Sequence, residues 1–290
     1  MTNVKCFPTG RRQFLGTLAG LGALAAARSA ASEAVAGKGR LKQAVCGSVF
    51  GGLRLDLEAQ CREVARLGAR GIDFVGPDGF AVLKKYGLVP TMVSGGSSIE
   101  RGINDPNNHA DIDRKLREMI KAAADGGAPN VIVMAGSRKR IADEEGLENS
   151  ARFLNNVKGL AEDCGVTLCV ELLNSKVDHP GYMADSTAWG VKLCQRVQSS
   201  RVKLLYDIYH MQIMEGDLIR TIRDNIQHIG HFHTAGNPGR HEFDETQELN
   251  YRAICKAIAD LSYQGYLSHE YSPTRDPLGT LERMLRICDV

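Results

Sequence analysis

The chain has 290 residues, of which 43% are hydrophobic and 24% are charged. This composition supports a sizeable core and excludes a disordered or fibrous protein. The length fits either two domains of about 150 residues or one barrel of about 250 residues with an additional segment. The formal charge of +2 gives no strongly basic surface, so nucleic acid is not expected as the main partner.

Residues 1–36 have the layout of an export signal. Arg11 and Arg12 precede a short, weakly apolar stretch, and small residues follow it. The segment resembles a twin-arginine signal, which predicts cleavage between Ala30 and Gly37, the twin-arginine translocase as a transient partner and a periplasmic location. The apolar run is shorter than the about 20 residues that span a bilayer, so we expect no stable membrane anchor. A cytoplasmic location is the alternative if the signal is not used.

The rest of the chain, residues 37–290, is predicted to form one domain. Residues 1–36 carry four basic residues against Glu33, a charge of +3, which leaves a charge of −1 for this body. Of the eight cysteines, Cys6 lies in the signal, and the other seven show no C-x-x-C spacing. We therefore expect small buried thiols rather than a disulfide framework or a thiolate zinc site.

Eight short apolar runs alternate with longer segments of helical period in this body. Each run is bounded by Gly, Pro or polar residues, which is typical of strands buried on both faces. The predicted strands are 41–46, 71–75, 88–93, 130–135, 167–171, 202–207, 228–234 and 265–270. The predicted helices are 57–67, 112–124, 148–164, 186–197, 218–225, 251–261 and 278–287. This α/β pattern predicts a (β/α)8 TIM barrel; a doubly wound sheet would usually carry a G-x-G-x-x-G loop, which is absent.

Four late strands end in side chains that can bind a hard metal ion: Glu171, Asp207, His233 and Glu270. Their separations of 36, 26 and 37 residues each correspond to about one β/α unit. In a parallel barrel this spacing returns the chain to the C-terminal mouth, where such barrels hold their active sites. Three carboxylates and one imidazole favour Mn²⁺, Mg²⁺ or Co²⁺. Taken singly, each residue also has a structural explanation, such as a helix cap for Asp207.

Over almost the whole body the chain resembles the hydroxypyruvate isomerase group of the xylose isomerase-like TIM barrels. The most specific matches are Y-D-I-Y-H-M-Q at 206–212 and N-P-G-R at 237–240, and supporting stretches lie at 100–103, 133–136, 171–174, 179–181, 250–251 and 270–273. The resemblance implies that Glu171, Asp207, His233 and Glu270 are the metal ligands and that Glu171 and Glu270 also transfer protons. It further implies that His210, Arg240 and Asn174 contact the substrate.

The activity that the resemblance implies is that of a divalent-metal-dependent isomerase. Such an enzyme would interconvert the aldose and ketose forms of a small α-hydroxy carbonyl compound or sugar through an enediolate. At the position of His233, hydroxypyruvate isomerases usually have glutamine. The histidine of this chain resembles the ketose 3-epimerases instead. Those epimerases usually carry a further glutamate in the segment that corresponds to residues 174–178, where this chain has Asn-Ser-Lys-Val-Asp and no glutamate. A ketose 3-epimerase, a lyase or dehydratase acting on an oxidised sugar, and a periplasmic sugar-binding barrel without activity are the alternatives.

Arg240 and His210 each have a second interpretation. Arg240 would either form a fork to substrate oxygens or pair with the nearby Glu242. His210 would either contact substrate or serve as a structural hydrogen-bond donor.

The other histidines and the long loops complete the prediction. His231 and His269 are expected to point into the helix layer, away from the ligands. The loops 94–109 and 174–182 are expected to determine selectivity. The oligomeric state, a homo-oligomer included, stays open.

Overall fold

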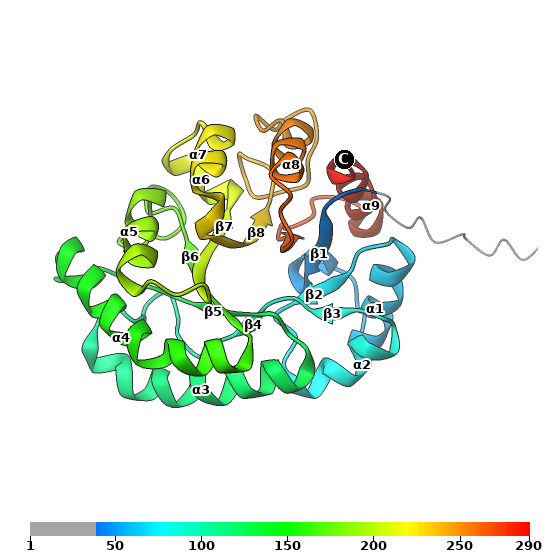
Figure 1. Ribbon diagram of the computed structural model, residues 1–290. Helices are drawn as coiled ribbons and strands as arrows, with labels where there is room; N and C mark the ends of the chain where they lie inside the picture. The colour runs from blue at the N-terminus through cyan, green and yellow to red at the C-terminus, as the bar shows by residue number, and fades with distance from the viewer. Residues whose placement is uncertain (1–38) are drawn as a thin grey trace, which may run out of the picture. The chain divides into compact units, whose positions relative to one another are not determined.

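Nine short strands, all parallel, form one sheet in the computed structural model, which describes residues 39–290. The strand order is β3-β2-β1-β9-β8-β7-β6-β5-β4. Strands β3 and β4, at the two ends of this order, overlap the single strand predicted at 88–93, and residues 91–92 connect them, so the barrel is nearly closed (Figure 1). The strands are β1 (Lys42–Cys46), β2 (Gly71–Asp73), β3 (Val89–Pro90), β4 (Val93–Ser94), β5 (Asn130–Val133), β6 (Thr167–Leu172), β7 (Val202–Asp207), β8 (Ile229–Thr234) and β9 (Tyr266–His269).

Helices surround this barrel and alternate with the strands, which confirms the predicted TIM barrel (Figure 1). All seven predicted helices are present, and the short α2 and α6 are additional. The helices are α1 (Leu57–Arg66), α2 (Phe80–Lys85), α3 (His109–Gly126), α4 (Asp143–Cys164), α5 (Thr187–Val197), α6 (Ile208–Met214), α7 (Leu218–Asn225), α8 (Tyr251–Asp260) and α9 (Pro277–Cys288). The short 3₁₀ turns are η1 (Gly47–Phe50), η2 (Pro77–Gly79), η3 (Pro106–Asn108) and η4 (Ile226–His228).

Local sequence signals fix several helix ends. The Asp56 side chain accepts a hydrogen bond from the backbone of α1, and the Ser186 side chain does the same for α5. Helices α3 and α4 end at Gly127 and Gly165, whose φ angles of 75° and 68° lie in the left-handed region that favours glycine. Because α3 and α4 end at these glycines, only short loops connect them to the next strands, β5 and β6.

The strands bury both of their faces, which explains their continuous apolar runs. The outward faces join the helices in one large hydrophobic cluster, and a second, small cluster consists of Met92, Ile132, Cys169 and Leu205. Two residues beyond Cys169 and Leu205 on the same strands come Glu171 and Asp207. Because side chains two apart share a strand face, the small cluster forms the apolar floor below the polar residues of the barrel mouth.

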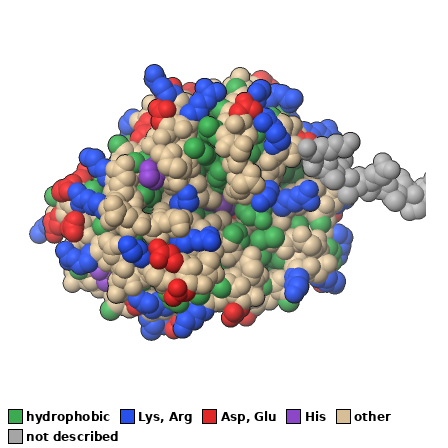
Figure 2. Space-filling model, in the orientation of Figure 1, with side chains coloured by type: hydrophobic (Ala, Val, Ile, Leu, Met, Phe, Trp, Pro, Cys, Tyr) green, Lys and Arg blue, Asp and Glu red, His purple; other side chains and the backbone are tan. Residues whose placement is uncertain are grey.

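The seven cysteines of the described residues are free thiols, and all except Cys164 are buried, as predicted. None of the helices within residues 39–290 is long and apolar enough to cross a membrane. On the face seen in Figure 2, basic and acidic side chains are interspersed. The predicted export signal and its cleavage window lie outside the described residues.

Candidate metal centre and active site

The four predicted ligands converge at the C-terminal ends of the adjacent strands β6 to β9. One ligand atom from each of Glu171, Asp207, His233 and Glu270 lies within 4.8 Å of every other. The parallel register sets Asp207 directly beside His233 on the neighbouring strand. Glu171, Asp207 and His233 are buried, whereas the Glu270 side chain keeps 23% of its surface exposed. The site is therefore closed from below and open on the side of Glu270.

His233 directs its Nδ1 atom at this cluster. Its Nδ1 lies 2.9 Å from Glu270 Oε2 and 3.5 Å from Glu171 Oε1. This buried Nδ1 nevertheless makes no hydrogen bond of good geometry to any residue from 39 to 290. An imidazole nitrogen that faces three carboxylates without a well-formed hydrogen bond to any of them fits a divalent cation of the Mn²⁺, Mg²⁺ or Co²⁺ type. The side chains of this site therefore fit a metal ion.

The two glutamates have opposite pKa shifts. Burial raises the pKa of Glu171 to about 7, and the negative charge of Glu270 adds to this effect. Burial also favours the protonated form of Glu270, but His233 and Arg240 outweigh it and hold the pKa of Glu270 at about 2. Two carboxyl groups in one site with pKa values moved apart are suited to different roles, one as proton carrier and one as base.

Asp73 at the end of β2 holds His233 in place, and the sequence interpretation missed it. Its Oδ2 accepts hydrogen bonds from the Nε2 atoms of both His231 and His233, each at 3.0 Å. Its Oδ1 accepts a hydrogen bond from Thr91 Oγ1. Since Nε2 of His233 is bonded to this carboxylate, Nδ1 is the nitrogen that faces Glu171 and Glu270 and would be the ligand atom for a bound ion, an arrangement common for metal-binding histidines.

The prediction that His231 points into the helix layer is wrong. His231 and His233 are two residues apart on β8, so both face the barrel interior, and their ring centres are 5.2 Å apart. His269, which is adjacent to Glu270, does face the other way. Its Nδ1 is bonded to Thr234 and its Nε2 to Gln43, whose own amide donates to a carbonyl of α9.

Arg240 reaches the centre of the site from the loop after β8. Its Nη2 donates to Asp207 Oδ2 at 3.0 Å and to Glu270 Oε2 at 2.6 Å. The expected alternative, a pair with Glu242, is wrong because the Glu242 carboxylate is bonded to Thr274 and paired with Arg275 instead. Burial disfavours the charged guanidinium, but the two carboxylates outweigh this and raise the pKa of Arg240.

His210 and Asn174 lie beside Arg240. The Asn174 Oδ1 accepts from the backbone N–H groups of Val177 and Asp178, which directs its amide nitrogen to His210 Nδ1 at 2.6 Å. Burial lowers the pKa of His210 to about 4, so the ring is neutral at pH 7. The other ring nitrogen, Nε2, lies 3.0 Å from Arg240 Nη1, so His210 contacts both Asn174 and the guanidinium. The His210 ring therefore lies directly beside the guanidinium of Arg240 in the site.

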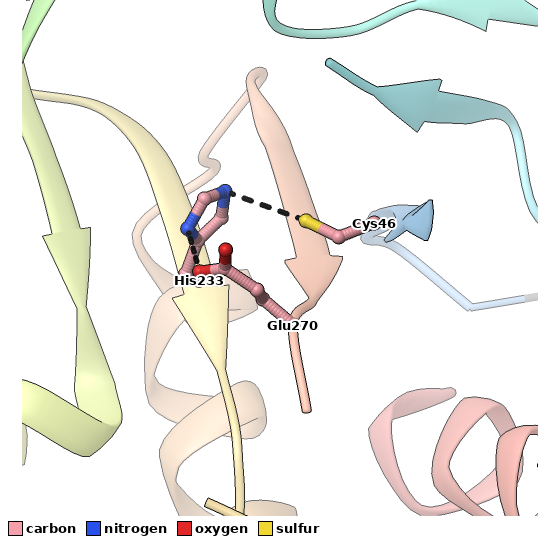
Figure 3. Close-up of side chains that lie close together, drawn as sticks. All are labelled: Cys46, His233 and Glu270. Atoms are coloured by element: carbon pink, nitrogen blue, oxygen red, sulfur yellow. Dashed lines mark hydrogen bonds and ion pairs between the residues drawn. The ribbon is translucent and has the colours of Figure 1, made fainter. Parts of the chain in front are cut away.

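Cys46, at the end of β1, completes a second candidate group with His233 and Glu270 (Figure 3). Its Sγ lies 4.0 Å from His233 Nε2, on the side of the ring opposite to the four-ligand cluster. Burial raises the pKa of the thiol far above its ordinary value, so it stays protonated. A neutral thiol is a poor ligand for a hard cation, and the cluster of three carboxylates and His233 is the better metal site.

A strained aromatic residue stands at the rim. Phe74 follows Asp73 and has a φ angle of 63°, a left-handed conformation that costs a bulky residue about 1–3 kcal/mol. Its ring lies edge-on to His233, with ring centres 5.9 Å apart, yet 40% of the residue is exposed. Backbone strain of this kind commonly occurs at functional sites.

Comparison with known proteins identifies the family. The family model described as "Xylose isomerase-like TIM barrel" matches residues 61–288. The chain belongs to this family. Among curated proteins of related sequence, the "Putative hydroxypyruvate isomerase" of Xenopus laevis is 31% identical over 60% of this chain and 66% of its own length. The "2-oxo-tetronate isomerase" of Cupriavidus necator is 34% identical over 60% of this chain and 67% of its own length. The chain thus spans about two thirds of these relatives.

Solved structures share the fold over most of the chain. An "AP endonuclease, family 2" from Brucella melitensis has a TM-score of 0.76 at 23% identity and covers 83% of this chain and 97% of its own. A "3-keto-D-glucoside 4-epimerase" from E. coli has a TM-score of 0.73 at 21% identity and covers 86% of this chain and 100% of its own. At these identities the structural likeness extends to the barrel fold alone.

Proposed function

We propose that the protein is a divalent-metal-dependent isomerase of the hydroxypyruvate isomerase type, acting on a small α-hydroxy carbonyl compound. The observation that supports this most strongly is the convergence of Glu171, Asp207, His233 and Glu270, with His233 Nδ1 facing the carboxylates. A divalent ion bound there would polarise the carbonyl and hydroxyl oxygens of the substrate and stabilise an enediolate. The curated relatives that are named isomerases support the same reaction class.

The protein's own side chains supply the remaining steps of the reaction. Glu270, whose pKa is held at about 2, is ionised at neutral pH and acts as the base that removes the proton beside the carbonyl. The Arg240 guanidinium, which lies beside the neutral His210 ring, donates hydrogen bonds to the substrate oxygens on which negative charge develops. Return of the proton to the neighbouring carbon, with transfer of the hydroxyl proton to the former carbonyl oxygen, completes the aldose–ketose interconversion.

The substrate that fits these groups is a small hydroxylated oxo acid. Arg240 already binds carboxylate oxygens of the protein with its Nη2 atom, so its fork suits an anionic substrate group as well. The sequence relatives named for hydroxypyruvate and 2-oxo-tetronate favour chains of three or four carbons.

A ketose 3-epimerase is the second candidate, favoured by two features of the site. His233 stands at the ligand position where, by the resemblance described above, epimerases carry histidine. Glu171 and Glu270 both have carboxylate oxygens at His233 Nδ1, so a proton removed by one glutamate can be replaced by the other. Replacement on the opposite face of the same carbon would give epimerisation rather than isomerisation.

We further propose that residues 1–36 direct export to the periplasm through the twin-arginine translocase, on the evidence of Arg11-Arg12 and the small-residue exit alone. Replacement of both arginines by lysine should retain the full-length chain in the cytoplasm of a bacterial host. Periplasmic delivery of that variant at the wild-type level would overturn this proposal.

The proposed reaction is tested by following hydroxypyruvate and ketose substrates by NMR with the metal-loaded protein and with protein treated with a chelator. Isomerase activity predicts interconversion of aldehyde and ketone signals. Epimerase activity instead produces a diastereomeric ketose, and a lyase loses a β-substituent. Sugar binding without metal and without turnover would show that the barrel is a binding protein and would exclude the proposed reaction.

A further inference from the structure

Phe74 is an exposed aromatic residue that does not pack in the hydrophobic core. Its ring belongs to neither hydrophobic cluster of the barrel, although the next residue, Val75, packs against the larger one. Within residues 39–290, only Phe74 and Val177 are large hydrophobic residues with a high exposed fraction, 40% and 64%. Exposure of a phenylalanine to water is unfavourable, so its packing in the barrel does not explain its position.

The backbone holds Phe74 at this position from both sides. Asp73, the preceding residue, is tied through Oδ2 to His231 and His233. The Phe74 N–H donates to the carbonyl of Met92 at 2.7 Å, which links the end of β2 to the segment between β3 and β4. These bonds maintain the left-handed φ angle of 63°, which a glycine would adopt without strain. A phenylalanine kept in a conformation suited to glycine indicates that the ring itself is needed there.

The ring is directed at the candidate active site. Its edge-on contact with His233 sets the ring centres 5.9 Å apart at an interplanar angle of 82°. The polar atoms that would hold the reacting oxygens of a substrate belong to Glu171, Asp207 and Glu270. Phe74 has no polar side-chain atom, so it suits the C–H groups of a substrate carbon beyond the reacting pair.

We infer that Phe74 is the apolar wall of the substrate site and that it favours α-hydroxy carbonyl acids with at least one hydroxylated carbon beyond the reacting pair. This inference rests on the proposed function. A three-carbon substrate such as hydroxypyruvate has no such carbon and leaves the ring exposed. A four-carbon 2-oxo-tetronate extends onto the ring and covers the surface that is otherwise in water.

The test compares Phe74→Ala and Phe74→Gly with the wild-type protein on hydroxypyruvate and on 2-oxo-tetronate. Both variants should lose about tenfold in kcat/KM on the four-carbon substrate, mainly through KM, and less than threefold on the three-carbon substrate. The affinity for Mn²⁺, measured by calorimetry, should stay within twofold of the wild type. The glycine variant removes the strain as well as the ring, so it serves as the second variant if the alanine variant folds poorly.

Gln198→Gly is the matched control, because Gln198 also has a positive φ angle, 51°, at the C-terminal end of α5. It relieves strain away from the site and should leave the kinetics on both substrates unchanged. Equal losses on the two substrates, no loss on either, or a parallel loss of Mn²⁺ affinity would overturn the inference and assign Phe74 a shielding role at His233. If the wild-type protein converts neither compound, the proposed function itself fails.

Discussion

Asp73→Asn removes one negative charge behind His233 while it keeps the size and shape of the side chain. The amide oxygen can still accept from Nε2 of both His231 and His233, and the amide nitrogen can donate to Thr91 Oγ1. Each of the two 3.0 Å bonds then changes from a bond to a charged acceptor to a bond to a neutral one. A bond to a charged group contributes about 1.5–3 kcal/mol and a neutral bond about 0.5–1.5 kcal/mol.

Only the bond to His233 is coupled directly to metal binding. Its weakening by about 1–1.5 kcal/mol, together with a less basic Nδ1, predicts about a tenfold loss of metal affinity. Calorimetric titration of the metal-free protein with Mn²⁺ measures this value, and the thermal midpoint shows whether the variant is folded.

Thr91→Val is the matched control for this prediction. It removes the neutral hydroxyl that donates to Asp73 Oδ1 and leaves the carboxylate and both histidines unchanged. We expect its Mn²⁺ affinity to stay within twofold of the wild type. If the folded Asp73→Asn protein bound Mn²⁺ as tightly as the wild type, the role of Asp73 in orienting His233 would be refuted.

Three further predictions concern the acid–base groups and the cation of the site. Glu270→Gln should bind Mn²⁺ but lose substrate α-proton exchange with solvent by about 10²–10⁴-fold, and full exchange in this variant would exclude Glu270 as the base. Arg240→Lys should lower kcat/KM about 10- to 100-fold, because an ammonium cannot contact Asp207, Glu270 and a substrate oxygen together; steady-state kinetics on both proposed substrates measure the loss. Burial lowers the pKa of His269 to about 3, below the 6.5 of an unfolded histidine, so its contribution to stability is complete above pH 6.5 and is lost as the pH falls toward 3. The free energy of unfolding, measured by urea titration, should therefore fall with decreasing pH by up to about 1.4 kcal/mol per unit, and His269→Gln should reduce this slope.

Much of the barrel could be predicted from the sequence because its strands are buried on both faces. Their continuous apolar runs give all eight strand positions, and the spacing of one β/α unit predicts that Glu171, Asp207, His233 and Glu270 meet at one mouth. Helices α2 and α6 were missed because six and seven residues are too few to show a helical period.

The contacts around the ligands depend on distant parts of the chain. Asp73 meets His233 across 160 residues of sequence, and no local pattern marks the pair. His231 and His233 are two residues apart on one strand, and this spacing is visible in the sequence. It correctly predicts that both side chains face the barrel interior. Arg240 is aimed at Asp207 by a loop in which its own φ angle is 55°, a conformation that the residue type does not predict.

The most direct test of the central claim is hydrogen exchange at the substrate carbon in D₂O. The Mn²⁺-loaded protein and a chelator-treated sample are incubated with hydroxy-aldehydes, ketoses and 3-keto sugars, and loss of the α-proton signal is followed by NMR. Exchange marks a substrate even where net conversion is small. We predict exchange on at least one small α-hydroxy carbonyl compound with metal and none after chelation. Exchange that persists at the same rate after complete removal of the metal would contradict the account.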